Sequence, residues 1–130
     1  MKWFRKAAAQ GYATAQFSIG RKYALGEGVP KDSAEGLKWF RKAATRGEVH
    51  AQFTLGLMYA NGEGVPKDEI EGLAWFNIVA ASGDENGVKR RKILEQRVGR
   101  EMTLAAQQRS KEILKQIEAA KRVSTTPAPK

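Results

Sequence analysis

The stretch Gly-Glu-Gly-Val-Pro-Lys-Asp at residues 26–32 is repeated without change at residues 62–68, so the two copies start 36 residues apart. The similarity extends outward from this stretch, because residues 11–46 and 47–82 are identical at about twenty of 36 aligned positions. A fixed period of roughly 20–50 residues is typical of proteins built from stacked structural repeats. We therefore predict a solenoid in which these two segments are complete units.

Each unit is predicted to form two helices joined by the repeated stretch. The first helix is expected at Ala13–Leu25 in one unit and at Val49–Asn61 in the other. In the first of these, Ala15, Ile19 and Tyr23 recur every four residues, which places them on one apolar helix face. The glycines of the repeated stretch are expected to end this helix. The predicted fold class is an all-α solenoid of stacked helix-turn-helix repeats.

Two local features repeat with the same period. Asp32 is a predicted N-cap, and Glu35 three residues later completes a pattern that resembles a capping box; residues 68 and 71 repeat the pair. Gly20 and Gly56 lie in the middle of the first helices, where glycine costs about 1 kcal/mol relative to alanine. This repeated cost predicts that another helix crosses closely there, with a tryptophan ring against the glycine.

The two ends of the chain depart from the full unit. Residues 1–10 match residues 37–46 almost position by position, so we predict a half repeat at 1–10, which would expose an apolar edge. We expect the chain to be a piece of a longer array; the alternative is that a partner covers this edge. After residue 83 the period fails, and a pair of C-terminal capping helices is predicted over residues 84–122. The second of these is expected to start from a cap at Thr103. The polar, proline-containing residues 123–130 are predicted to be a disordered tail.

Both units resemble the Sel1-like repeat, a relative of the tetratricopeptide repeat with a longer connector. The resemblance covers about two-thirds of the chain and rests on a pattern that both units carry. In the first unit the matching residues are Ala15, Ile19, Gly20, Tyr23, Gly26, Gly28, Val29, Asp32, Leu37, Trp39, Lys42, Ala43, Ala44 and Gly47. In the second unit they are Ala51, Leu55, Gly56, Tyr59, Gly62, Gly64, Val65, Asp68, Trp75, Ala80, Ala81 and Gly83.

The resemblance implies a scaffold for protein complexes, in which the first helices of successive units line a concave groove. It also implies a bacterial-type protein, periplasmic or secreted if a signal peptide precedes this segment and cytoplasmic otherwise. Some cysteine-rich members of the family are described as penicillin-binding or β-lactamase-like. This sequence has no cysteine, so that activity is not carried over.

The groove is expected to bind a protein or peptide partner through positions on the first helices that packing does not require. Phe17 and Phe53 are expected to be core residues, because both copies keep phenylalanine there. An arginine with leucine and an amide suits an extended peptide or a partner helix. Ordinary solvated surface is the alternative interpretation of the same positions. The predicted partner-binding residues are Thr14, Arg21, Leu25, His50, Leu57 and Asn61.

The net charge of +9 is concentrated towards the end of the chain. Residues 1–83 contain 11 basic and 8 acidic side chains, whereas residues 84–130 contain 12 and 6. The sharpest charged feature is a basic patch formed by Lys89, Arg90, Arg91 and Lys92. The alternative function is therefore a basic module that docks on nucleic acid or an anionic surface through residues 89–100. No aromatic residue is interleaved in this run for base stacking, which favours a solvated helix face over nucleic acid.

The residue types do not favour an enzyme, and we expect no cofactor, metal site or membrane span. His50 is the only histidine, so a His-based metal site or triad cannot form within one chain. Gly26 and Gly28 have no preceding strand, third glycine or lysine-serine pair, which indicates a turn rather than a phosphate loop. No apolar run approaches the ~18–20 residues of a membrane span. The oligomeric state is not determined by the sequence.

Overall fold

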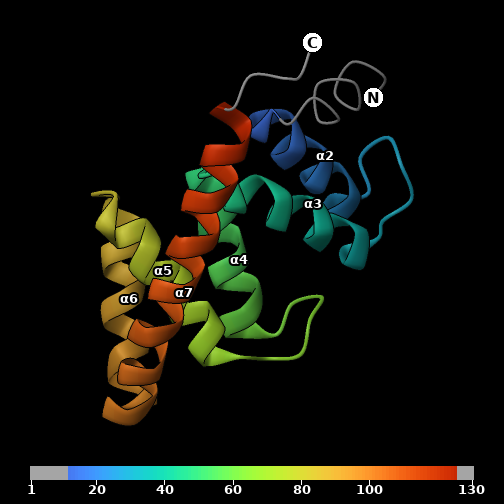
Figure 1. The fold of residues 1–130 in the computed structure, drawn as a ribbon. Coiled ribbons are helices and arrows are strands. Elements are labelled where there is room, and N and C mark those ends of the chain that lie inside the picture. Colours follow the sequence, from blue (N-terminus) through green and yellow to red (C-terminus); the bar gives the residue numbers. More distant parts are fainter. Residues whose placement is uncertain (1–11, 126–130) are drawn as a thin grey trace.

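The computed structural model describes residues 12–125, and over this range it contains helices and no strand. The predicted all-α repeat architecture is confirmed, because α2 with α3 and α4 with α5 form two successive helix-turn-helix units (Figure 1). The bounds of both first helices are those predicted, whereas the half repeat at residues 1–10 lies outside the described residues. The helices are α2 (Ala13–Leu25), α3 (Ser33–Thr45), α4 (Val49–Asn61), α5 (Glu69–Ala81), α6 (Glu85–Val98) and α7 (Arg100–Thr125).

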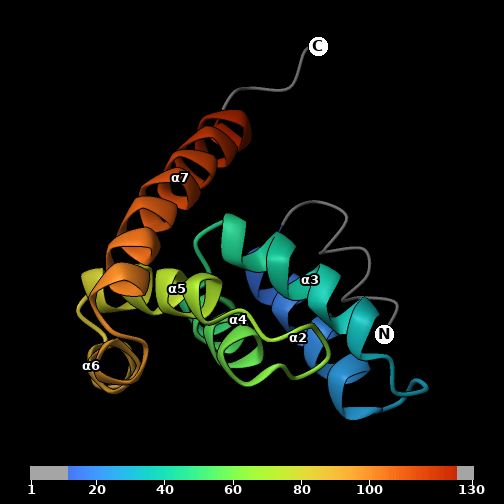
Figure 2. The ribbon, with the colours of Figure 1, turned by 90° about the horizontal axis from the view of Figure 1, so that it is seen from below.

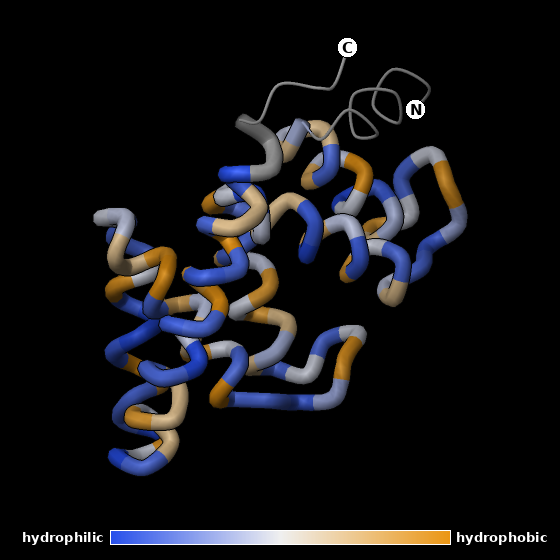
Figure 3. The backbone as a smooth tube through the Cα atoms, in the orientation of Figure 1, coloured by the Kyte–Doolittle hydropathy of each residue, from blue (hydrophilic) through white to orange (hydrophobic). Residues whose placement is uncertain are grey.

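The helices form two layers. Figure 2 shows α2, α4 and α6 along one side of the molecule and α3, α5 and α7 along the other. The main hydrophobic cluster lies between the two units, where Phe40 and Ala44 of α3 pack with Leu55 of α4 and Trp75 of α5. Hydrophobic and hydrophilic residues alternate along α6 and α7 (Figure 3), as expected for helices that bury only one side.

The repeated stretch forms the same elbow in both units, and both elbows project from the same side of the molecule (Figure 1). Gly26 and Gly62 end their helices with φ of 71°, in the left-handed region that favours glycine. The elbow then closes back on the first helix, because the Asp32 N–H donates to the Tyr23 carbonyl at 2.8 Å. Asp68 and Tyr59 repeat this bond at the same distance.

The N-caps of α3 and α5 are confirmed, but only half of each predicted capping box forms. Oδ1 of Asp32 accepts a hydrogen bond from the Glu35 N–H at 3.1 Å, and Asp68 accepts one from Glu71 at 3.0 Å. The reciprocal bond would need the aspartate N–H, which already donates to the tyrosine carbonyl of the preceding first helix. The glutamate carboxylates are therefore available for other partners.

Gly20 and Gly56 do lie where helices cross closely, but the prediction of a tryptophan ring against them is wrong. A Cβ added to Gly20 would lie 2.7 Å from the Phe40 ring, and one added to Gly56 would lie 2.5 Å from the Phe76 ring. Trp39 precedes Phe40 by one residue and so points about 100° away around the helix. It packs instead beside the cluster that contains Ile19.

The two closing helices follow different paths. α6 packs against α5, and Gly87 and Leu94 are buried on its inner edge. Gly99, with φ of 86°, turns the chain within one residue, so α7 begins at Arg100 and the predicted cap at Thr103 is wrong. The Thr103 hydroxyl instead donates to the Gly99 carbonyl at 2.7 Å. α7 continues to Thr125, so the predicted disorder is wrong for residues 123–125, and residues 126–130 lie outside the described residues.

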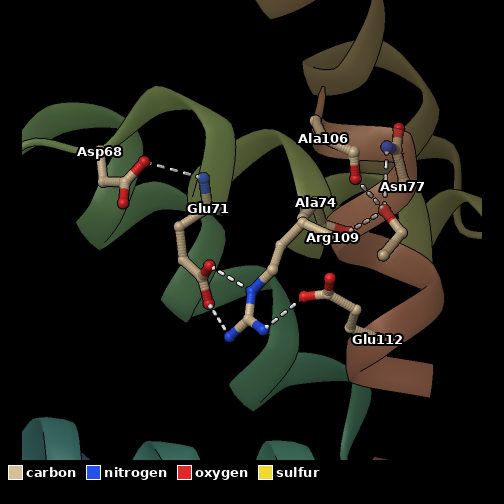
Figure 4. Close-up of polar contacts among 8 residues, drawn as sticks. Asp68, Glu71, Ala74, Asn77, Ala106, Arg109 and Glu112 are labelled. Carbon is tan, nitrogen blue, oxygen red and sulfur yellow. Dashed lines mark hydrogen bonds and ion pairs between the residues drawn. The ribbon is translucent and has the colours of Figure 1, made fainter. Parts of the chain in front are cut away.

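α7 packs mainly on α5 rather than on α6, and its later part reaches α3 (Figure 1). Ile113 and Ile117 enter the cluster between the two units, where both are buried. A buried Ser110 hydroxyl lies 2.8 Å from the Ala106 carbonyl and 3.2 Å from that of Ala74, and it accepts a bond from the Asn77 amide at 3.1 Å (Figure 4). These contacts set the position of α7 along α5.

An ion pair reinforces this position. Arg109 of α7 donates two hydrogen bonds to the Glu71 carboxylate of α5, at 2.8 and 3.3 Å, and a third to Glu112 at 3.1 Å (Figure 4). The pKa of the Arg109 guanidinium is raised above its ordinary value, mainly because of the side-chain hydrogen bond to Glu71. Glu71, which the sequence assigns to a capping box, therefore binds α7 through its side chain.

Candidate protein-binding groove

A groove of about 500 Å³ lies between the first helices of the two units. Apolar side chains from α2, α3 and α4 make up much of its lining, including Phe17, Phe40 and Met58. The two elbows supply further lining residues, because Lys31 comes from the first and Glu63 from the second. The groove is therefore built by both units together, and neither unit forms it alone.

Aromatic packing positions the apolar part of this groove. The Phe17 ring lies 5.6 Å from the Phe40 ring and 6.0 Å from the His50 ring, measured between centroids, and both pairs are tilted. Both separations lie within the range of about 4.5–7 Å that is typical of interacting aromatic rings. Phe17 is half-buried, so the prediction that it is a core residue is only partly correct. At the end of α2, Leu25 lines the groove while 56% of its surface is exposed to solvent.

The predicted partner-binding residues do not share one cavity. Arg21 and Leu25 line the groove between α2 and α4. Leu57 and Asn61 instead line a smaller hollow of about 50 Å³ between α4 and α6. Two further predicted residues line neither: Thr14 is exposed near the start of α2, and the exposed His50 ring lies 3.0 Å from the Glu48 carboxylate.

Sequence reasoning missed several residues of the groove. Thr54 and Met58 of α4 line it, as does Ser33 at the start of α3. Residue 58 is methionine where the equivalent residue of the first copy is Lys22. Leu57 is predicted because its residue type differs between the copies, and the same difference could have indicated Met58. The elbow residues had no such signal, because helical periodicity does not tell on which side a connector lies.

The basic patch does not form a single charged face. Four consecutive helical residues point in directions about 100° apart, so the run surrounds α6. Arg90 lines the hollow between α4 and α6, whereas Arg91 lies on the side facing α7 and pairs with Glu95 at 3.5 Å. Lys89 and Lys92 are exposed. Arg97, within the same basic segment, pairs with Glu69 of α5 at 2.8 Å.

Metal-ligating side chains and long apolar helices are the other features of residues 12–125 that bear on function. Within this range, no three His, Asp or Glu side chains gather closely enough to hold a metal ion. No helix in the described part of the chain is both long and apolar enough to cross a membrane.

Comparisons with known proteins agree with this architecture. The model of the Sel1 repeat matches residues 1–12, 13–48 and 49–84. A similar solved structure is that of a protective antigen present in uropathogenic Escherichia coli strains, which displays an SLR fold. It is 34% identical, with a TM-score of 0.83 over 99% of this chain. This chain covers only 28% of the length of that antigen.

A second similar structure is a Sel1 repeat protein from Oxalobacter formigenes, which is 40% identical with a TM-score of 0.67. That match covers 70% of this chain and 68% of the other. No curated protein sequence matches the chain. The family match extends over more than half of the sequence, and the chain therefore belongs to the Sel1 repeat family.

Proposed function

We propose that this protein is a non-catalytic interaction scaffold that binds a segment of a partner protein in the groove between α2 and α4. Sel1 repeat proteins generally mediate protein–protein interactions, and their fold is generally a non-catalytic scaffold. The observation that carries the proposal is the groove itself, which both units line with apolar side chains and a few polar ones. This composition suits a bound peptide segment.

A substitution at Leu25 tests whether the groove binds the partner. It lines the groove and is 56% exposed, so Leu25→Asp places a charge in the groove with little effect on the core. Leu104 of α7 is 54% exposed and does not line the groove, so Leu104→Asp is a matched control. A partner captured by the full chain is mapped by cross-linking, and its bound segment is then made as a peptide. We expect Leu25→Asp to weaken peptide binding about tenfold or more in calorimetry, a loss of about 1.4 kcal/mol, and Leu104→Asp to leave it unchanged.

A second pair of variants separates this proposal from docking through the basic patch. Arg21→Glu combined with Leu57→Asp should abolish capture of the partner if the first helices bind it. Neutralising Lys89, Arg91 and Lys92 of the basic patch with glutamine should then have little effect, because these three residues line neither the groove nor the hollow between α4 and α6. Capture that disappears only in the glutamine variant, with a steep salt dependence, would refute groove binding in favour of the basic module.

A further inference from the structure

The charges around the groove have one predominant sign. Neither α2 nor α4 contains an aspartate or glutamate. The third lining helix, α3, contains one, Glu35, which pairs with Lys38 and does not line the groove. Arg21 of α2 and Lys31 of the first elbow bring two positive charges to the lining. Glu63 of the second elbow is the single carboxylate among the lining residues. The groove therefore has an excess of positive charge beside its apolar surface.

The two cations are also available to a ligand. Among residues 12–122, neither Arg21 nor Lys31 makes an ion pair or a side-chain hydrogen bond. By contrast, Arg97 and Arg109 are each held by a carboxylate at 2.8 Å. An unpaired cation beside apolar surface favours a carboxylate that arrives with a partner, and it repels a basic segment.

The smaller hollow between α4 and α6 also combines apolar side chains with positive charge. The starts of α2, α4 and α6 are 36 residues apart, so Ile93 has the position in α6 that Leu57 has in α4 and Arg21 in α2. Ile93 lines this hollow and is 61% exposed, so the apolar surface extends beyond the groove. Arg90 lines it too and makes no ion pair with any described residue. A bound segment that continues towards α6 meets a further positive charge.

We infer that the groove selects an acidic protein segment, one that places an apolar side chain against Phe17 and Met58 and a carboxylate against Arg21 and Lys31. This inference rests on the proposed function and names the chemical class of its partner. Charge complementarity is the reason for committing to an acidic protein segment. Complementary charge raises the rate at which an acidic segment meets the groove, and it disfavours basic partners.

The test is a selection of peptides from a random displayed library on the full chain, followed by anisotropy measurements with an enriched peptide. We expect enrichment of peptides that combine aspartate or glutamate with leucine or phenylalanine. Changing the carboxylates of such a peptide to amides should weaken binding about tenfold or more. The double variant Arg21→Gln/Lys31→Gln should weaken binding of the acidic peptide by a similar factor.

The matched control is Lys67→Gln/Arg100→Gln, which removes the same charge from two exposed residues that do not line the groove. Lys67 is the repeat equivalent of Lys31, so the pair compares the same elbow position in two units. We expect this variant to bind the acidic peptide as the unaltered chain does. Equal weakening by both double variants would show a general charge effect and overturn the inference.

Other outcomes separate the inference from the proposed function. Enriched peptides that are neutral or basic, and whose binding Leu25→Asp still lowers, would overturn the acidic partner but leave groove binding in place. A library that yields no peptide sensitive to Leu25→Asp would overturn both. Tight binding of a labelled single-stranded oligonucleotide that Arg21→Gln/Lys31→Gln abolishes would assign the groove to nucleic acid instead, and would also overturn the inference.

Discussion

At the scale of single residues, the repeat depends on how closely the two helices of a unit approach. Both helices of a unit have a glycine where they cross. Gly36 of α3 lies against the Gly20 carbonyl of α2, and Gly72 of α5 lies against the Gly56 carbonyl of α4. In addition, the ring of Phe76 occupies the space that a side chain at residue 56 would need. Close packing between the two helices requires these glycines. An unusual backbone conformation does not, because none of the four has a positive φ.

Gly56→Ala should therefore destabilise the protein even though alanine is the better helix former by about 1 kcal/mol. The new Cβ would lie 2.5 Å from the Phe76 ring, and both groups are buried. Overpacking of this kind typically costs about 1–3 kcal/mol. The measurement is the free energy of unfolding in urea. In a double-mutant cycle, Phe76→Leu should relieve part of the loss, and strict additivity of the two changes would contradict the proposed clash.

At the scale of elements, α7 is attached to α5 by contacts that the repeat pattern does not contain. The Arg109 guanidinium binds Glu71 with two hydrogen bonds, and Glu71 is only 12% exposed. The buried Ser110 hydroxyl bonds the Asn77 amide and lies near backbone carbonyls of both helices. Since polar groups buried in this way need their partners, sliding α7 by one turn would leave several of them unsatisfied.

Arg109→Gln should lower the free energy of unfolding by about 1–3 kcal/mol, because it leaves the Glu71 carboxylate without its partner. Arg91→Gln breaks the more exposed pair with Glu95 within α6 and should cost only about 0.2–0.5 kcal/mol. Thermal unfolding monitored by circular dichroism compares the two. Similar losses in both variants would mean that the contact to Glu71 does not hold α7.

The pH dependence of this contact follows from the raised pKa of Arg109, whose main cause is the hydrogen bond to Glu71. The contribution of this contact to the free energy of unfolding is fully present below the ordinary arginine pKa. It is lost only as the pH rises through the higher pKa that Arg109 has in the folded protein. The difference in stability between the original chain and Arg109→Gln should therefore not fall between neutral and moderately alkaline pH. Unfolding curves at two such pH values check this expectation.

At the scale of the whole molecule, α7 joins the two units to each other. A solenoid is ordinarily stabilised only by contacts between neighbouring elements. Here Ile113 and Ile117 of the last helix enter the cluster that also contains Phe40 of α3 and Trp75 of α5. A helix that lies outside both repeats therefore contributes to the core that holds the two units together.

Ile113→Ala should destabilise both units together. Ile113 is 1% exposed, and truncation of such a side chain costs about 2–5 kcal/mol. Leu114→Ala is the control, because this neighbouring residue is 42% exposed and its truncation should cost well under 1 kcal/mol. Native-state hydrogen exchange should show parallel loss of protection in α3 and α5 for Ile113→Ala. Loss confined to α7 would contradict the coupling of the two units.

The 36-residue period by itself determined the fold class, the bounds of both first helices, the left-handed elbows and the aspartate caps. All of these depend on residues close together in the chain or on comparison of two copies. The tertiary structure alone decided that phenylalanine and not tryptophan lies on the glycines, and that α7 leaves α6 to cross α5. It also decided that four of the predicted partner-binding residues divide between two hollows while Thr14 and His50 line neither. These features depend on contacts such as Arg109 to Glu71, 38 residues apart, and on the angle at Gly99. A local pattern indicates which face of a helix is apolar, but the neighbour that covers this face is set by how whole helices pack.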